Sequence, residues 1–249
     1  MQRKKESGKS SQSELVRLNK YIANAGVCSR RDADTLIAEG KIKVNGKTIT
    51  ELGTKVSVRD KIEYRGKVLS REQFRYVLLN KPKDLITTMD DPEDRDTVMK
   101  LVKNACQERI YPVGRLDRHT TGLLLFTNDG QLAKKLTHPS HQMKKIYQVE
   151  LDRPISKADF DAVLKGVELE DGKAIVDELA LVGAGGHILG LEIHIGKNRI
   201  VRRIFESLGY KVTKLDRVMF GPLTKKDLPR GKWRHLSPKE VMNLKNSVK

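Results

Sequence analysis

Residues 114–130 read GRLDRHTTGLLLFTNDG, which joins the densest apolar run of the chain to an acidic residue just before it. The run Gly122–Thr127 predicts a buried strand, because four consecutive large apolar side chains leave no face for solvent. Asp129 follows as the cap of a helix over residues 130–137. Asp117 therefore lies on a rigid rim beside a buried strand. An Asp followed by Thr and Gly is also a common turn former, so these residues alone leave its role open.

The apolar pattern on either side of this stretch predicts one larger unit, residues 74–249, in which helices and strands mix. A glycine-rich loop at residues 183–186 indicates a hairpin, since it neither opens a helix nor precedes Lys-Ser/Thr as a phosphate loop does. Because strands and helices do not alternate strictly, we expect an α+β fold on a mixed sheet flanked by helices. Strands are expected at residues 76–79, 110–117 (with a loop), 146–151 and 188–195, and helices at 97–105, 156–165 and 199–208.

Residues 14–73 show a separate pattern of two helices followed by short strands. Apolar residues at three- and four-residue steps predict a helix over residues 15–25, and Ser29 is suited to cap a second helix over residues 30–39. A strand at residues 42–44 leads into Asn45-Gly46, a strong hairpin signal. Further short strands are expected around Val56, Val58 and Ile62.

Basic side chains are expected on the outer faces of the helices of this smaller unit, where they can contact phosphates. Its residues 15–62 resemble the S4-like RNA-binding module, which grips structured RNA by shape and backbone. A solvated helix face is the plainer interpretation of any one of these residues. The candidate RNA contacts are Arg17, Lys20, Ser29, Arg30, Arg31, Lys41 and Lys43.

The whole chain is basic, with 49 Lys and Arg against 32 Asp and Glu, a net charge of +17 and a pI near 9.8. Residues 1–13, 14–73 and 74–249 carry net charges of +3, +5 and +9, so the excess is not confined to a tail. Such a distribution indicates a nucleic-acid partner, although a merely basic ribosome-associated protein would share it. Residues 1–13 are rich in Lys and Ser and predict a disordered basic tail.

Composition also narrows the class of protein. A mean hydropathy of −0.52 and the absence of an apolar run of about 20 residues argue against a membrane-spanning protein. The polar residues that follow Met1 predict no secretory signal, so we expect a cytoplasmic protein. Cys28 and Cys106 are too few for a disulfide framework, and His138 and His141 lack zinc-ligand spacing, so no metal is expected.

Four motifs, in order, are similar to those of RNA pseudouridine synthases. The branch they resemble is the RsuA/RluB type, which modifies ribosomal RNA and carries an S4-like domain. Asp84 stands where this family usually has Gly, and Ile200 where Gln is common; Asp tolerates unusual backbone angles better than most residues. In chain order, the motifs are Leu79-Asn80-Lys81-Pro82, the stretch at residues 114–130 quoted above, Lys145-Ile146-Tyr147, and GKNRIVRRIF at residues 196–205.

The resemblance implies isomerisation of uridine to pseudouridine by one carboxylate without a cofactor. Asp117 matches the catalytic residue, Arg202 the cation that would keep it ionised, and Tyr147 the aromatic ring that stacks on the flipped base. Arg115, Lys81 and Arg203 are expected among the RNA contacts, with Lys81 alternatively structural.

The segments at residues 166–172 and 228–234 look more like large-subunit enzymes than small-subunit ones, so 23S rather than 16S ribosomal RNA is the expected partner. We expect this RNA to be either free or part of a pre-ribosomal particle, and the enzyme to be a monomer. Two other classes remain open: a non-catalytic RNA-binding or ribosome-assembly factor on the same fold, and an RNA glycosidase. A glycosidase usually needs a second catalytic carboxylate, and no motif in the sequence indicates one.

Overall fold

The computed structural model describes residues 15–57, 59–70 and 73–248, and the chain divides into two compact units, Met1–Gln73 and Phe74–Lys249. The tail predicted at residues 1–13 and the strand residue Val58 lie outside the described residues. Each unit has its own buried core.

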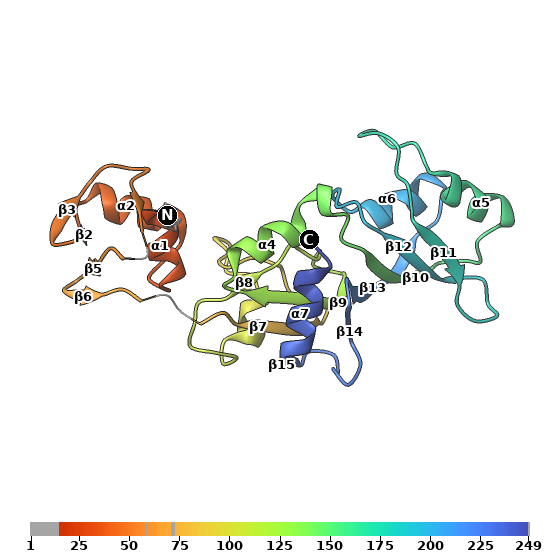
Figure 1. Cartoon of the computed structure of the whole chain (residues 1–249). Helices are drawn as coiled ribbons and strands as arrows, with labels where there is room; N and C mark the ends of the chain where they lie inside the picture. Colours follow the sequence, from red (N-terminus) through yellow and green to blue (C-terminus); the bar gives the residue numbers. More distant parts are fainter. Residues whose placement is uncertain (1–14, 58, 71–72, 249) are drawn as a thin grey trace, which may run out of the picture. The chain divides into compact units, whose positions relative to one another are not determined.

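The smaller unit shares one apolar core between two helices and short strands (Figure 1). Leu18 and Ile22 of the first helix, Ile37 of the second, and Ile42 of the sheet are all buried. Four strands pair antiparallel in the order β3-β2-β5-β6, and β1 pairs with β4. The elements are β1 (Val16–Arg17), α1 (Leu18–Asn24), α2 (Arg30–Ala38), β2 (Ile42–Val44), β3 (Lys47–Ile49), β4 (Lys55–Val56), β5 (Ile62–Tyr64) and β6 (Lys67–Val68).

Local signals in this unit are mostly confirmed. Ser29 caps α2 with a capping box, in which its hydroxyl accepts from the Asp32 N–H at 3.2 Å. Asn45 and Gly46 have φ of 52° and 81° in the β2–β3 turn, the positive angles that a two-residue hairpin requires. The first helix begins at Leu18 rather than at residue 15, because residues 16–17 pair with β4 instead.

The larger unit is built on a nine-stranded sheet whose path runs β11-β12-β10-β13-β9-β7-β15, with β14 on β13 and β8 on β9. In the described residues its pairs are antiparallel except β9 with β13, so the expected mixed α+β fold is confirmed. The strands are β7 (Tyr76–Lys81), β8 (Tyr111–Pro112), β9 (Thr121–Thr127), β10 (Lys145–Leu151), β11 (Glu178–Leu181), β12 (Ile188–Ile193), β13 (Val212–Phe220), β14 (Leu223–Thr224) and β15 (Trp233–His235). The helices are α3 (Met99–Val102), α4 (Gly130–Thr137), the 3-10 turn η1 (Pro139–His141), α5 (Lys157–Lys165), α6 (Ile200–Ser207) and α7 (Pro238–Asn246).

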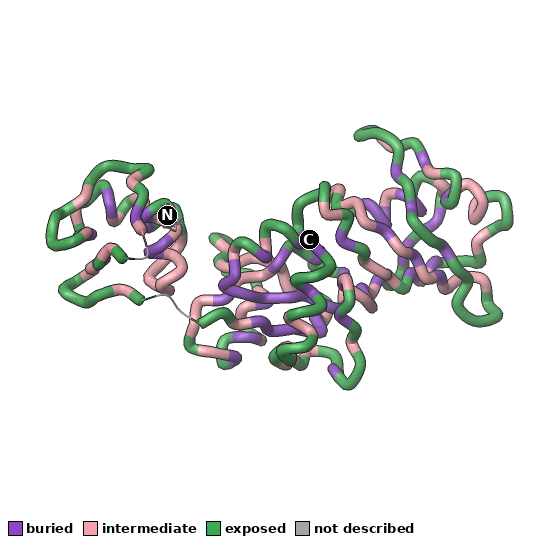
Figure 2. Tube along the Cα trace, viewed as in Figure 1, coloured by how far each residue is buried: buried purple, intermediate pink, exposed green. Residues whose placement is uncertain are grey.

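Strand β9 is buried on both faces, as its apolar run predicts (Figure 2). Leu123 and Leu125 join a core that includes residues of α4 and α7. Leu124 and Phe126 join a core on the other face that includes Val102 of α3. A third core lies between β10–β13 and the helices α5 and α6 at the far end of the sheet (Figure 1). The first residues of β9, which pair with β13, are therefore held in a well-packed frame.

Gly122 is required where β9 meets β13 in parallel. It has φ of 108°, and a Cβ there would lie 2.3 Å from the backbone oxygen of Arg217. The two strands are in register as Asp216 with Thr121 and Arg217 with Gly122. This close approach brings β13 beside the loop that carries Asp117.

Three expectations for the larger unit are corrected. The helix expected at residues 97–105 has only one α-helical turn, α3, and the strand expected at residues 110–117 is only β8. The helix expected from residue 199 begins at Ile200, because Arg199 adopts φ of 47°. In the part of the chain that the structure describes, no helix has the length and apolar character needed to cross a membrane.

Candidate active site

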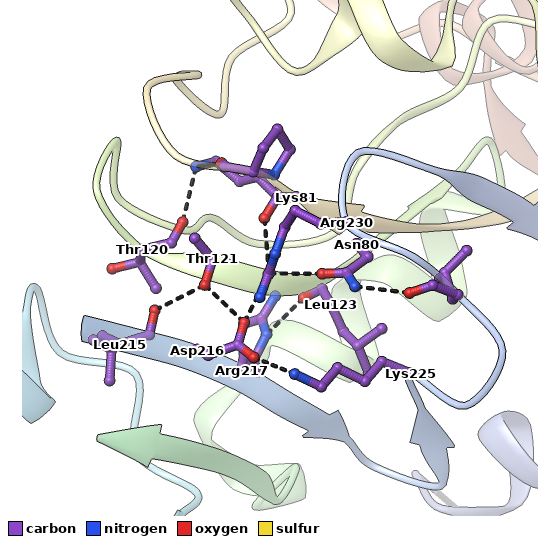
Figure 3. A network of polar contacts seen from close by, with 12 residues as sticks. Asn80, Lys81, Thr120, Thr121, Leu123, Leu215, Asp216, Arg217, Lys225 and Arg230 are labelled. Carbon is purple, nitrogen blue, oxygen red and sulfur yellow. Dashed lines mark hydrogen bonds and ion pairs between the residues drawn. The ribbon is translucent and has the colours of Figure 1, made fainter. Parts of the chain in front are cut away.

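The loop that carries Asp117 is pinned by a buried lysine. The Lys81 side chain is fully buried at the end of β7. Its ammonium donates to the backbone oxygens of Asp117 (3.1 Å), Arg118 (3.2 Å), Thr120 (2.9 Å) and its neighbour Pro82 (3.1 Å). Burial lowers the pKa of Lys81 to about 8. The expectation that Lys81 contacts RNA is therefore corrected, because every donor points into the protein; its contact with Thr120 is drawn in Figure 3.

Further hydrogen bonds hold the backbone of this loop. The Thr87 hydroxyl donates to the oxygen of Leu116 at 2.8 Å, and the Asp84 N–H donates to the oxygen of Arg118 at 2.9 Å. The Thr120 N–H closes a turn on the oxygen of Asp117 at 3.0 Å. The backbone around Asp117 is thus fixed before any substrate binds, and its half-buried carboxylate is placed by this frame.

A pocket of about 340 Å³ opens beside Asp117. Arg115, Asp117 and Tyr147, three of the predicted site residues, line it together. Arg115 is exposed, whereas Tyr147 is half-buried. Its walls are supplied by strands β10, β12 and β13, by the end of α4 and the start of α6, and by the loops before β9 and α6. The apolar side chains among them include Ile193, Ile195, Val201, Leu215 and Phe220.

Tyr147 reaches this pocket from β10, opposite Leu191 of β12 and Arg217 of β13. The β10–β13 register shifts between Ile146 and Tyr147, a bulge of the kind that re-aims side chains beside active sites. Lys145, two residues earlier, also lines the pocket and donates to the backbone oxygen of His194 at 2.6 Å. The Lys-Ile-Tyr motif therefore delivers one cation and one aromatic ring to the same cavity.

Arg202 and Arg203 point in different directions from α6. Arg202 is buried and donates to the oxygens of Val212 (2.9 Å) and His119 (3.4 Å), so it braces the Asp117 loop through the backbone. Burial lowers the pKa of Arg202, whereas the charge of Asp117 raises it. Arg203 forms a bidentate ion pair with Asp171 at 2.9 and 3.0 Å, so its guanidinium is already engaged.

Arg217 is a pocket residue that the sequence did not single out. It is only 4% exposed, its Nε donates to the oxygen of Leu123 at 2.8 Å, and it lines the pocket. Nothing in its immediate sequence marks it, because charged residues interrupt the strand pattern of β13. Only the approach of β13 to β9 places it at the pocket that Asp117 also lines.

The candidate RNA contacts of the smaller unit are available at its surface. Arg17, Arg30, Arg31, Lys41 and Lys43 are exposed. Lys20 and Ser29 are partly covered, and the Ser29 hydroxyl is engaged in capping α2. Lys41 forms an exposed ion pair with Glu39 at 2.6 Å.

Family models match both units. The model described as RNA pseudouridylate synthase matches residues 75–207, and the S4 domain model matches residues 16–62. The chain belongs to the RNA pseudouridylate synthase family. The expected partner class, RNA, is confirmed at this level by the two matches.

Relatives of this family match along nearly the whole chain. A Bacillus subtilis (strain 168) protein named ribosomal large subunit pseudouridine synthase B is 44% identical over 93% of this chain and 96% of its own length. An uncharacterised RNA pseudouridine synthase of Aquifex aeolicus (strain VF5) is 40% identical over 94% and 95%. A solved pseudouridylate synthase is 30% identical and superimposes with a TM-score of 0.66 over 92% of this chain and 99% of that structure.

The two departures from the motifs of the pseudouridylate synthase family have a clear structural context. Asp84, at a position where Gly is usual, adopts φ of 69°, and its carboxylate lies 3.3 Å from Nδ1 of His119. Ile200 begins α6, where its buried side chain belongs to the core beside α5 and α6 and also lines the pocket. In the described ranges, no group of three His, Cys, Asp or Glu side chains is arranged to hold a metal ion.

Proposed function

We propose that this protein converts uridine to pseudouridine in large-subunit (23S) ribosomal RNA, with Asp117 as its catalytic residue and without a cofactor. The observation that carries the proposal is the Asp117 carboxylate, held on a pinned loop at a pocket that Tyr147 also lines. The choice of large-subunit RNA rests on the name of the Bacillus subtilis relative, which matches end to end.

The reaction is an isomerisation. The C1′–N1 bond of uridine breaks with its electron pair on the base, the base turns, and C5 bonds to C1′. The C5 proton leaves and N1 gains one, so the composition of the RNA does not change. An ionised Asp117 can assist by attack on the ribose or by taking a ribose proton, and both routes leave the electron pair on uracil.

The other site residues divide into contact and positioning roles. Tyr147 offers a ring to stack on the flipped base, which has lost its neighbours in the RNA. Arg115, exposed at the rim, is suited to the backbone of the flipped nucleotide. Arg202 acts on Asp117 through charge and through the loop backbone. Lys81 positions the loop.

We assign the chemistry to residues 74–249 and RNA anchoring to residues 14–73. All pocket-lining residues lie between residues 113 and 220, within the larger unit, which supports the assignment of the chemistry to that unit. We also propose that the enzyme acts as a monomer and in the cytoplasm, where ribosomal RNA is made and assembled. The exposed basic side chains of the smaller unit support its role as the anchor.

The test is Asp117→Asn, which keeps the shape and removes the charge. Release of label from C5 of uridine should fall to background, with RNA binding retained. Asp94→Asn, at an exposed aspartate outside the pocket, is the matched control and should convert at the wild-type rate. Activity of Asp117→Asn within about tenfold of wild type would move the chemistry to another residue.

Transcripts of both ribosomal RNAs test the substrate. We expect label release from 23S but not from 16S RNA. The reverse preference would contradict the large-subunit assignment, and binding without release from either RNA would favour a non-catalytic RNA-binding factor.

A further inference from the structure

Two residues that line the pocket, Thr120 and Arg217, each have a buried polar side-chain atom with no hydrogen-bond partner among the described residues, and Arg217 is the one that carries a charge. Arg217 is 4% exposed, and its Nε donates to the oxygen of Leu123. Its terminal nitrogen Nη2 is buried and has no hydrogen-bond partner among the described residues. Buried donors are nearly always satisfied, so an orphan one in a binding pocket indicates an acceptor supplied by the ligand. Figure 3 shows Arg217 with its contact to Leu123.

The pocket is lined by more positive than negative side chains. Among the residues that line it, Asp117 is the one carboxylate, against five basic side chains. Two of the five, Lys145 and Arg217, line the cavity from adjacent strands. Burial and, to a smaller extent, the charge of Arg217 together lower the pKa of Lys145 to about 8. Two neighbouring cations in a partly dry cavity favour an anion between or beside them.

The surroundings of Arg217 fit a planar, uncharged or singly charged ring better than a phosphate. Its guanidinium carbon lies 5.0 Å from the ring centroid of Phe220, and Tyr147 sits directly across on β10. The exposed basic residues that suit phosphates, such as Arg115, lie at the rim instead. Arg217 therefore lines the pocket next to Tyr147, the residue proposed to stack on the flipped base.

We infer that Arg217 donates from Nη2 to a carbonyl oxygen of the flipped uracil and stabilises the negative charge of that base after the C1′–N1 bond breaks. The inference rests on the proposed function. When the bond breaks, its electron pair spreads from N1 onto the carbonyl oxygens, so a donor aimed at one of them binds the detached base more tightly than the intact nucleoside. Preorganised donors of this kind act mainly on the rate of the chemical step.

The first experiment separates rate from binding with full-length Arg217→Gln. Removing one such donor costs about 10²–10³ in rate, so single-turnover conversion at saturating RNA should fall at least 100-fold. The dissociation constant for RNA should stay within about threefold of wild type. The control is Arg234→Gln. Arg234 is also bonded within the protein, to Glu240 at 2.7 Å, but lies outside the pocket, so this variant should convert RNA at the wild-type rate.

A rate for Arg217→Gln within threefold of wild type would overturn the inference, as would a loss explained wholly by weaker RNA binding. If Arg217→Gln fails to fold by circular dichroism, Arg217→Lys decides. Lysine keeps the positive charge but lacks the second terminal nitrogen of the planar guanidinium, so conversion should slow at least tenfold at unchanged RNA affinity. An unchanged rate would overturn the inference.

The second experiment does not need conversion, so it distinguishes this inference from the proposed function. The probe is 5-nitrouracil, which is anionic at neutral pH, compared with neutral uracil, both bound to full-length Asp117→Asn. Binding of 5-nitrouracil should exceed that of uracil, and adding Arg217→Gln should remove at least tenfold of the difference. Equal binding of the two bases before and after that change would overturn the inference even if wild type converts RNA.

Discussion

At the scale of single residues, Lys81 shows how a charged side chain can serve a site that it never enters. Its ammonium donates to the carbonyls of Asp117, Arg118 and Thr120, and the side chain is sealed from solvent. The loop therefore depends on one buried donor group, and its loss would leave several acceptors unpaired in the interior.

We predict that Lys81→Met lowers the free energy of unfolding by about 2–3 kcal/mol and slows conversion more than it weakens RNA binding. Methionine fills the space but cannot donate, so the Asp117 loop loses its anchor. The measurements are denaturant unfolding and single-turnover rates. Lys83→Met, at an exposed lysine two residues along, is the control, and equal stability losses in both variants would refute the anchoring role.

At the scale of elements, neighbouring residues of β13 point to opposite faces of the sheet and so serve two purposes, one at the pocket and one in a stabilising polar network. Arg217 lines the pocket, whereas Asp216 points to a polar network with Thr121, Arg230 and Lys225 (Figure 3). The Thr121 hydroxyl and Arg230 lie 2.7 and 2.8 Å from the Asp216 carboxylate. This network holds β13 to β9 at the junction where Gly122 allows close approach.

The network predicts an acid-sensitive contribution to stability. Burial raises the pKa of Asp216, but hydrogen bonds from Arg230, Lys225 and Thr121 outweigh it and lower the pKa from 3.8 to about 2. A lowered carboxyl pKa stabilises the folded state above about pH 4 and loses that effect as pH falls through about 2. The contribution is about 2 kcal/mol at neutral pH.

We therefore expect Asp216→Asn to reduce the free energy of unfolding at pH 6, with a smaller difference from wild type at pH 2.5. Denaturant unfolding at the two pH values measures it. Asp227→Asn, at an exposed aspartate, should show little difference at either pH. A penalty for Asp216→Asn that is the same at both pH values would show that the carboxylate charge contributes nothing.

At the scale of the whole molecule, the two units have separate cores, so we predict that chemistry and RNA anchoring can be separated. The smaller unit buries Leu18, Ile22 and Ile37 among its own residues, and the larger unit has three cores of its own. A fragment of residues 73–249 should therefore fold. It should bind ribosomal RNA more weakly and with a shallower salt dependence, because each lost phosphate contact removes roughly one unit of slope.

Binding across a salt series, beside single-turnover rates at saturating RNA, measures this prediction. The full-length double variant Arg30→Ala with Arg31→Ala should show the same change to a smaller degree, since both side chains are exposed. If the fragment bound with the affinity and slope of the whole chain, residues 14–73 would not be the RNA anchor.

Much of the fold followed from short-range signals. The cap at Ser29, the Asn45-Gly46 turn and the doubly buried run of β9 each depend on residues within a few positions, and all three are confirmed. The motif residues Asp117 and Tyr147 were also expected together, and the structure places both at one pocket. Their catalytic roles remain predictions.

Sequence alone therefore determined the local elements, the two-unit pattern and the motif residues, because helix caps, tight turns and apolar periodicity act between near neighbours. Tertiary structure alone decided that Lys81 is buried, that Arg202 braces the backbone, and that Arg217 enters the pocket. The reason is distance along the chain: Arg217 and its partner Leu123 are 94 residues apart, and no local pattern encodes the pairing of β9 with β13. Whether a buried charged side chain has all its hydrogen-bond partners depends on carbonyls that are distant in sequence. These carbonyls come together only in the folded protein, so the role of such a residue cannot be predicted from the sequence alone.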